Sequence, residues 1–173
     1  MTMQQLTTYA EALERRMPVE TFIVLAKDRD GVCNPITVNW VMRTSIEPPL
    51  IAVSIAHSRY SHEVVREAGA FVVAAPSVTM SEETRFFGTK SGRKVAKLAE
   101  KGTATEAASE IDCLLLSDAV LNLECRLEDV FETGDHSIFV GRVVASHVNT
   151  DGAVQRLYTV GPGHRFGAVV PGE

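Results

Sequence analysis

Short segments with the residue pattern of β-strands recur along the chain. Residues 119–131 are expected to be extended, since they begin an alternation of apolar and polar positions, and residues 137–148 are rich in β-branched side chains. Because successive side chains of a strand point to opposite faces, such alternation is typical of a strand with one buried face. Further extended segments, bounded by turn residues or proline, are expected at residues 21–26, 34–42, 50–55, 70–75, 114–116 and 155–160.

Fewer segments have helical spacing. Apolar residues at helical intervals predict a helix over residues 4–17, which Pro18 ends. Ser61 is a suitable N-cap for a helix over residues 62–68, and Gly69 is a suitable stop. Two further helices are expected, one starting at Ser81 and one over residues 93–101 that ends at Gly102.

The order of these elements favours a mainly β fold. Helices do not alternate regularly with strands, which argues against a doubly wound parallel sheet. Asp151-Gly152 is a hairpin signal before the last expected strand, over residues 155–160. The pattern therefore predicts a β-barrel or sandwich with helical excursions. With 173 residues, no internal repeat and no low-complexity linker, the chain is expected to form one domain over residues 1–173.

Composition and charge narrow the classes of function. Hydrophobic residues make up 45% of the chain and charged residues 23%, an ordinary globular balance. The net charge of −5 argues against nucleic acid as the main partner, because binding its phosphates needs a clustered basic surface. No apolar run approaches the ~20 residues of a membrane-spanning helix. Three cysteines without C-x-x-C spacing, and no secretory leader pattern, favour a cytoplasmic protein.

Two polar segments have the composition of an anion-binding site. Ser58-Arg59-Tyr60-Ser61 lies between an expected strand and a helix start, where hydroxyls, a guanidinium and free helix N–H groups suit a phosphate. Gly88-Thr89-Lys90-Ser91-Gly92-Arg93-Lys94, followed by Lys97, is basic within an acidic chain, but it is neither a P-loop nor a dinucleotide-binding fingerprint. Both segments are also consistent with an ordinary solvated surface.

Two further features could place chemistry near strand ends. Residues 34–45 surround the only tryptophan, Trp40, which favours a half-buried strand with Trp40 in the core over a strand whose amides face a flat ligand. Gly134-Asp135-His136 places an imidazole, the side chain that ordinarily titrates near neutral pH, at a strand-to-strand turn. No second His or Cys at metal-ligand spacing accompanies His136, so no metal site is expected. No G-x-S-x-G elbow supports hydrolysis.

Taken together and in order, these segments resemble the flavin reductase-like family of FMN-binding split barrels, in particular its single-domain flavoredoxin type. The resemblance implies an antiparallel Greek-key split β-barrel with peripheral α-helices, usually a homodimer. It implies FMN, or in some members FAD, as cofactor and NADH or NADPH as hydride donor, with the protein supplying position and electrostatics. The matching segments are residues 34–45, 48–61, 71–73, 88–97, 123–125 and 134–143.

The resemblance also assigns roles to residues of this chain. His136, as the catalytic residue, would stand near the flavin ring and the nicotinamide, and is expected to orient or polarise rather than to act as an obligatory acid. The implied cofactor-binding residues are, along the ring, Thr37, Val38, Asn39, Trp40, Ser54, Ile55 and Ala56, and, around the phosphate, Ser58, Arg59, Ser61, Ser91, Gly92, Arg93 and Lys97.

Three functions compete at this point. The first is an NAD(P)H-dependent flavin reductase-like oxidoreductase that passes electrons to free flavin, ferric iron or a partner such as an oxygenase. The second is a non-enzymatic FMN-binding electron carrier, and the third is a ligand-binding barrel without redox activity. Departures from the family pattern at Met42-Arg43, over residues 102–113 and over residues 161–167 concern substrate access more than flavin binding.

Overall fold

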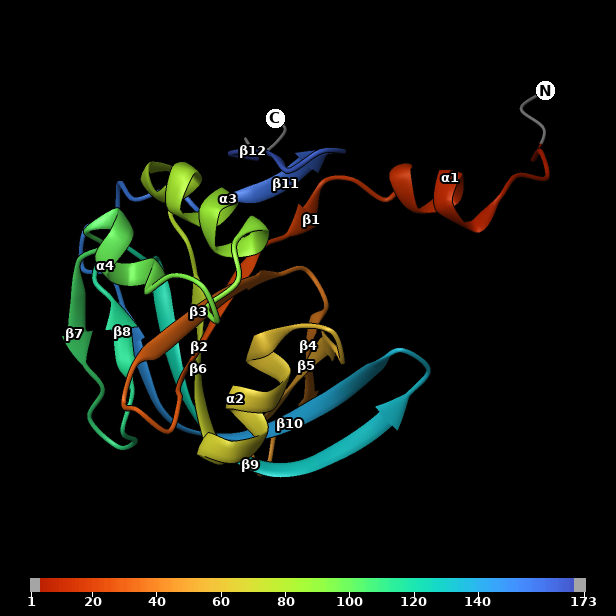
Figure 1. Ribbon diagram of the computed structural model, residues 1–173. Coiled ribbons are helices and arrows are strands. Elements are labelled where there is room, and N and C mark those ends of the chain that lie inside the picture. Colours follow the sequence, from red (N-terminus) through yellow and green to blue (C-terminus); the bar gives the residue numbers. More distant parts are fainter. Residues whose placement is uncertain (1–3, 170–173) are drawn as a thin grey trace.

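Strands dominate the computed structural model, which describes residues 4–169 and confirms the mainly β prediction (Figure 1). Seven strands form one antiparallel sheet in the order β3-β2-β6-β9-β10-β5-β4. Their bounds are β2 Phe22–Lys27, β3 Cys33–Val38, β4 Val41–Ser45, β5 Leu50–Ala56, β6 Ala70–Ala75, β9 Leu121–Thr133 and β10 His136–Val148. A three-stranded sheet contains β1 Val19–Glu20, β11 Tyr158–Gly161 and β12 Arg165–Gly167. A two-stranded sheet contains β7 Thr105–Ala107 and β8 Leu114–Leu116. The helices are α1 Tyr9–Glu14, α2 Tyr60–Ala68, η1 Val78–Met80, α3 Ser81–Thr89 and α4 Lys97–Lys101.

The seven-stranded sheet curls so that its two edges approach each other. The edge strands are β3 and β4, yet only Asn39 and Trp40 separate them in the chain. Because each residue of an extended chain spans at most about 3.5 Å, this link covers only about 10 Å. The two edges therefore meet beside Trp40, which is the split-barrel arrangement that the resemblance implies.

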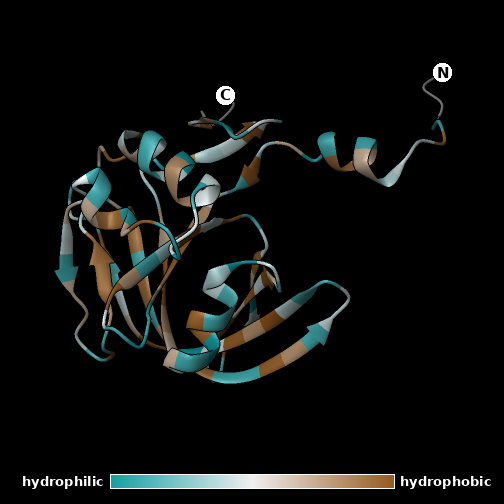
Figure 2. Cartoon of the chain, viewed as in Figure 1, coloured by the Kyte–Doolittle hydropathy of each residue, from teal (hydrophilic) through white to brown (hydrophobic). Residues whose placement is uncertain are grey.

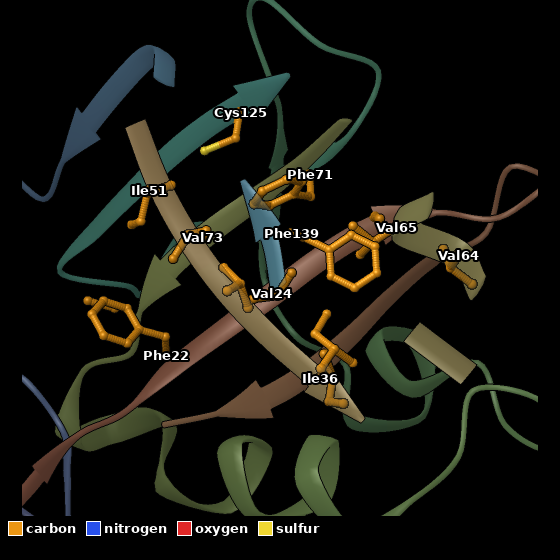
Figure 3. Packing of buried hydrophobic residues seen from close by; sticks show 14 residues of the cluster. Phe22, Val24, Ile36, Ile51, Val64, Val65, Phe71, Val73, Cys125 and Phe139 are labelled. Carbon is orange, nitrogen blue, oxygen red and sulfur yellow. The ribbon is translucent and has the colours of Figure 1, made fainter. Parts of the chain in front are cut away.

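The inner face of the curled sheet and α2 enclose one hydrophobic cluster (Figure 3). Phe71 and Phe139 are fully buried within it. Strands β2 and β6 are buried on both faces, because alternate residues such as Leu25 and Val72 join a second cluster together with Phe87 of α3. Burying each large apolar side chain contributes about 1.5–3 kcal/mol relative to exposure, so these central strands form the rigid support of the sheet edges.

The long β9–β10 hairpin confirms the predicted strand–turn–strand around Gly134. Gly134 has a φ of +52°, which glycine adopts at little cost, and His136 pairs with Thr133 across the turn. Apolar and polar residues occur along both strands (Figure 2), and they alternate over residues 121–128 of β9. On its other side β10 pairs with β5, so that His136 lies opposite Ala56. The hairpin thus places the imidazole beside the C-terminal end of β5.

Helix α1 is shorter than the helix predicted over residues 4–17. Thr8 caps it, since the Thr8 side chain accepts a hydrogen bond from the backbone N–H of Glu11 and the Glu11 carboxylate accepts one from Thr8. None of its residues is buried, and it lies apart from the sheets (Figure 1). Without a surface that covers its apolar side, the periodic segment does not extend the helix. No helix among residues 4–169 has the length and apolarity to cross a membrane.

Two other helix boundaries differ from the predictions. Helix α2 begins at Tyr60, and Ser61 is buried in its first turn rather than acting as N-cap; its hydroxyl accepts a hydrogen bond of 2.7 Å from Asn34 Nδ2. The helix predicted over residues 93–101 is reduced to α4, because residues 91–96 form turns before it. Gly69 and Gly102 end α2 and α4 in left-handed conformation, as predicted.

Two strand predictions are also corrected. The extended segment predicted over residues 34–42 is divided at Asn39 into β3 and β4. Asp151-Gly152 does not form a hairpin, because β10 ends at Val148 and the following strand, β11, pairs with β1 and β12. The last strand among the described residues is β12, which follows the turn at residues 162–164.

Candidate functional site

Two adjoining cavities form one groove along the link between β3 and β4. The larger has a volume of about 300 Å³ and the smaller about 110 Å³. They share Ile36, Ser58 and Arg59, and we call them the wide end and the narrow end of the groove. The wide end is further lined by Thr37, Val38, Asn39, Trp40, Ser54, Ile55, Ala56 and His136. The narrow end is further lined by Tyr60, Ser61, Phe87, Gly88, Thr89, Lys90, Ser91, Gly92 and Lys97.

Trp40 and His136 face each other at the wide end. Their ring centroids are 4.8 Å apart with the planes tilted by 35°. Trp40 is 46% exposed, so the expectation that it belongs to the core is wrong and the alternative of a ligand-facing strand gains support. His136 Nδ1 lies 2.6 Å from Asp135 Oδ1, and this hydrogen bond lowers the pKa of the Asp135 carboxyl. The imidazole is thereby fixed in orientation beside the indole.

The side chains of Thr37 and Asn39 are held by hydrogen bonds to other parts of the chain. Thr37 Oγ1 donates to the carbonyl oxygen of Thr84 at 2.6 Å. Asn39 Nδ2 donates to the carbonyl oxygen of Glu20 at 2.8 Å and to Thr159 Oγ1 at 2.9 Å. These bonds hold the end of β3 and its link to β4 in place. A ligand at the wide end would meet the backbone of this segment and the ring of Trp40.

Lys97 brings a buried positive charge to the narrow end. Its side chain reaches the carbonyl oxygens of Phe87 and Lys90, at 3.1 and 3.4 Å from Nζ, and the residue is only 3% exposed. Within residues 4–169 no carboxylate forms an ion pair with it. Burial, together with the positive charge of Arg59, lowers the pKa of Lys97 to about 8. A buried ammonium without a counter-charge is costly, so this cavity favours an anion.

Gly92 closes the narrow end against Asn34. A Cβ at position 92 would lie 2.0 Å from Asn34 Oδ1 and 2.9 Å from a ring carbon of Tyr60, so only glycine fits there. Asn34 Oδ1 itself is buried without a hydrogen-bond partner among the described residues. The turn that follows is held by the Ser91 hydroxyl, which accepts a hydrogen bond from the backbone N–H of Arg93 at 3.3 Å.

The structure brings every predicted site residue except Arg93 to the groove. The Arg93 guanidinium pairs with the Glu63 carboxylate and lies 4.8 Å from the centre of the Tyr60 ring, outside both cavities. The lining residues missing from the prediction are Ile36, Tyr60, Phe87, Gly88, Thr89 and Lys90. The basic composition of residues 88–94 was a signal for three of these. The carbonyl groups that hold Lys97 give no signal in the sequence.

Comparisons with known proteins cover this whole groove. The model of the flavin reductase like domain matches residues 14–162. The chain is 34% identical over 134 residues to an uncharacterized protein of Archaeoglobus fulgidus, which covers 76% of this chain and 73% of that protein. It is 33% identical over 114 residues to the NADH-dependent FMN reductase AsuE2 of Streptomyces nodosus subsp. asukaensis, covering 65% of this chain and 60% of that protein. A solved FMN-binding protein from Thermus thermophilus has the same fold, with a TM-score of 0.82, 23% identity and coverage of 97% and 96% of the two chains.

Proposed function

Because the chain belongs to the flavin reductase-like family, we propose that it is an oxidoreductase that binds FMN in the groove and accepts hydride from NADH or NADPH. The electrons would pass to free flavin, ferric iron or a partner protein such as an oxygenase. The observation that carries the proposal is the buried Lys97 ammonium, which faces the narrow end without a carboxylate partner among residues 4–169. The similarity to a protein named as an NADH-dependent FMN reductase supports the same activity.

The residues at the narrow end fit a terminal phosphate. Lys97 and Arg59 supply positive charge, and the hydroxyls of Ser58 and Ser91 line the same cavity. Gly92 lets the backbone of this turn lie directly against Asn34 and Tyr60. Charge-assisted hydrogen bonds of this kind are among the strongest that a protein makes to phosphate. This end, of about 110 Å³, would receive the phosphate of FMN.

The wide end would position the flavin ring and the nicotinamide. When bound, FMN supplies the hydride-accepting chemistry, so no protein nucleophile is needed. The backbone of β5 at Ser54 to Ala56 and the β3–β4 link offer polar groups along the cavity, and Trp40 offers an aromatic face. His136, held by Asp135 and beside Trp40, orients the reacting groups and can hold a proton there.

An absorption spectrum with and without NADH tests this function. We expect the purified protein to be yellow, or to become yellow with added FMN, and its flavin absorbance to bleach with NADH or NADPH under anaerobic conditions. If only a protein electron donor bleaches the flavin, the protein is an electron carrier and not an NAD(P)H-dependent enzyme. A colourless protein that does not bind FMN at micromolar concentration would overturn the proposal in favour of a redox-inactive ligand-binding barrel.

The variant His136→Ala tests the role of the imidazole. We expect hydride transfer in single-turnover stopped-flow measurements to slow by about tenfold, since the orientation that His136 provides is lost. Flavin content should be equal to that of the unsubstituted protein, because the phosphate is held at the other end of the groove. A full hydride-transfer rate and unchanged NADH affinity in this variant would show that His136 has no role in the site.

We further propose that a second copy of the chain covers the outer face of β4, β5, β9 and β10, forming a homodimer. Met42 is 61% and Phe131 52% exposed on this face, and two shallow cavities there share lining residues such as Ile138. Exposed apolar patches of this kind mark protein interfaces. One of the two cavities also shares Asn39, Trp40 and Ser54 with the wide end, so the second copy would lie next to the ring-binding region.

Sedimentation velocity tests the dimer. We expect the unsubstituted chain to sediment as a dimer at micromolar concentration and the double variant Met42→Arg/Phe131→Glu to sediment as a monomer. Val148→Arg is the matched control, since Val148 is 74% exposed at the far end of β10. A monomeric unsubstituted chain, or a double variant that still dimerises, would contradict the proposal.

A further inference from the structure

Four polar side chains converge on the hydroxyl of Ser137, outside the groove. Ser137 is fully buried, and its Oγ lies 3.1 Å from His57 Nε2, 2.8 Å from His62 Nε2 and 2.7 Å from Glu132 Oε2. His57 Nε2 is also 3.1 Å from the same oxygen of Glu132. One atom each of His57, His62 and Glu132 lies within 4.8 Å of the other two, which is a separation that one bound cation can bridge.

The fold fixes the backbone positions of these residues. Ser137 is paired with Ile55 of β5 on one side and with Glu132 of β9 on the other. His57 directly follows β5, and its backbone N–H donates to the carbonyl oxygen of Asp135 at 3.0 Å. His62 lies in the first turn of α2. Because successive residues of a strand point to opposite faces, the cluster lies on the face of β10 opposite the His136 side chain and the groove.

The polar atoms of the cluster point toward one another around Ser137. The Ser137 hydroxyl donates its one proton to Glu132 and can accept through its two lone pairs. Two imidazole nitrogens and the guanidinium of Arg66, at 3.4 Å, all face that oxygen. A neutral imidazole nitrogen that carries no proton has a lone pair, so a cation among these atoms would be met by imidazole and carboxylate lone pairs.

We propose that His57, His62 and Glu132 form a binding site for a Zn²⁺-class divalent cation, with the Ser137 hydroxyl as the fourth neighbour. Two imidazoles and one carboxylate are an established ligand set for Zn²⁺, which prefers four ligands. Imidazole nitrogen favours such first-row metals over Mg²⁺ or Ca²⁺. Arg66 pairs with the other oxygen of Glu132 and so acts as an outer partner that orients the carboxylate.

The side chains of His57 and Glu132 are 42% and 59% exposed, so a cation can reach the site from solvent, while the buried Ser137 forms its floor. A bound cation would join the end of β5, the first turn of α2 and the β9–β10 hairpin. Its ligands are separated by up to 75 residues in the chain, between His57 and Glu132. Because of this separation, the spacing of histidines and cysteines around His136 does not indicate the site.

Metal titration of the tag-free, chelator-treated protein tests the site. We expect Zn²⁺ to bind at one ion per chain in competition with a chromogenic chelator, and Co²⁺ to give the visible absorption of a four-coordinate site. Loss of a ligand should weaken Zn²⁺ binding by about tenfold or more, in both His62→Gln and Glu132→Gln. His164→Asn is the control: His164 is exposed, and its left-handed φ of +57° is one that asparagine tolerates.

Every outcome of the Zn²⁺ titration either supports or overturns the proposed cation site. Weakened binding in both ligand variants with unchanged binding in the control supports the site. Failure of the unsubstituted protein to bind one Zn²⁺, or equal affinity in Glu132→Gln and the unsubstituted protein, would overturn it and leave a hydrogen-bonded cluster. Glu132→Gln keeps this test decisive even if His62→Gln fails to fold, because Glu132 lies on the exposed side of the cluster.

Discussion

Glu124 and Lys97 are both buried charged side chains, but the chain surrounds them differently. Glu124 on β9 is fully buried and accepts hydrogen bonds of 2.7–3.1 Å from the backbone N–H groups of residues 109–111. It also accepts bonds from the Ser109 hydroxyl and His147 Nε2, at 2.8 and 2.6 Å. Burial raises the pKa of Glu124, but these donors outweigh it and lower the pKa to about 2. Lys97 instead has two carbonyl oxygens, and its pKa falls to about 8.

This difference is the one expected between a structural charge and the charge that we propose Lys97 offers to a phosphate. The protein itself stabilises the ionised form of Glu124, which ties residues 109–111 to β9. It does not do so for Lys97, whose ammonium form is disfavoured by burial and by Arg59. A phosphate at the narrow end would supply the missing negative charge. Substitutions at the two positions should therefore affect different properties, stability at Glu124 and ligand affinity at Lys97.

The largest effect on stability is expected for Glu124→Gln. The amide of glutamine would present its NH₂ group to N–H donors, so the hydrogen bonds would be lost. The lowered pKa of Glu124 corresponds to a loss on the order of 3 kcal/mol of unfolding free energy near neutral pH. Because the folded pKa is about 2 and the ordinary value 4.5, this stability is present above pH 4.5 and is lost as the pH falls toward 2. Urea unfolding across this range measures it, and FMN affinity should remain unchanged.

A smaller loss of stability, together with weaker FMN binding, is expected for Gly92→Ala. The new Cβ would meet Asn34 Oδ1 at 2.0 Å, so the turn must shift, at a cost of about 1–3 kcal/mol in unfolding free energy. The shift should also weaken FMN binding in a fluorescence titration. Gly152→Ala is the control, since a Cβ there meets no atom within 4 Å. Equal FMN affinity in the two variants would show that the turn at Gly92 does not form part of the ligand site.

The smallest effect on stability is expected for Lys97→Met. Unfolding free energy near neutral pH should stay within about 1 kcal/mol or rise, because removal of an unpaired buried charge offsets the lost hydrogen bonds. Without ligand, the unfolded chain binds the proton of Lys97 more tightly than the folded chain does, since the pKa of Lys97 is 10.5 in the unfolded chain and about 8 in the folded one. Stability should therefore rise from pH 8 to 10.5, and this rise should be absent in the variant. A large loss of stability would identify Lys97 as structural.

Much of the fold follows from local sequence pattern. The hairpin that carries His136 was predicted from alternation over residues 121–127, from the β-rich residues after the turn and from the turn at Gly134, because strand faces and turn conformations are set by neighbouring residues. The pattern failed where tertiary contacts decide. Helix α1 is short because no surface covers it, and Asn39 breaks an otherwise regular strand by bonding to Glu20 and Thr159.

The site shows the same division. The residue types at positions 58–61 and 88–94, followed by Lys97, indicated an anion site, and every residue assigned to the site except Arg93 lines the groove. The chemistry of Arg93 does not reveal that Glu63 of helix α2 pairs with it. Nor could the sequence show that Lys97 is buried, since this depends on the carbonyl groups at the end of α3.

The most direct measurement compares FMN with riboflavin, which lacks the phosphate, in the unsubstituted protein and in Lys97→Met. Flavin fluorescence quenching gives all four affinities. The unsubstituted protein should prefer FMN, and Lys97→Met should reduce this preference by about 10- to 100-fold, as expected for a lost charge-assisted hydrogen bond, while riboflavin affinity stays the same. An equal preference for FMN in both proteins would show that Lys97 does not receive the phosphate.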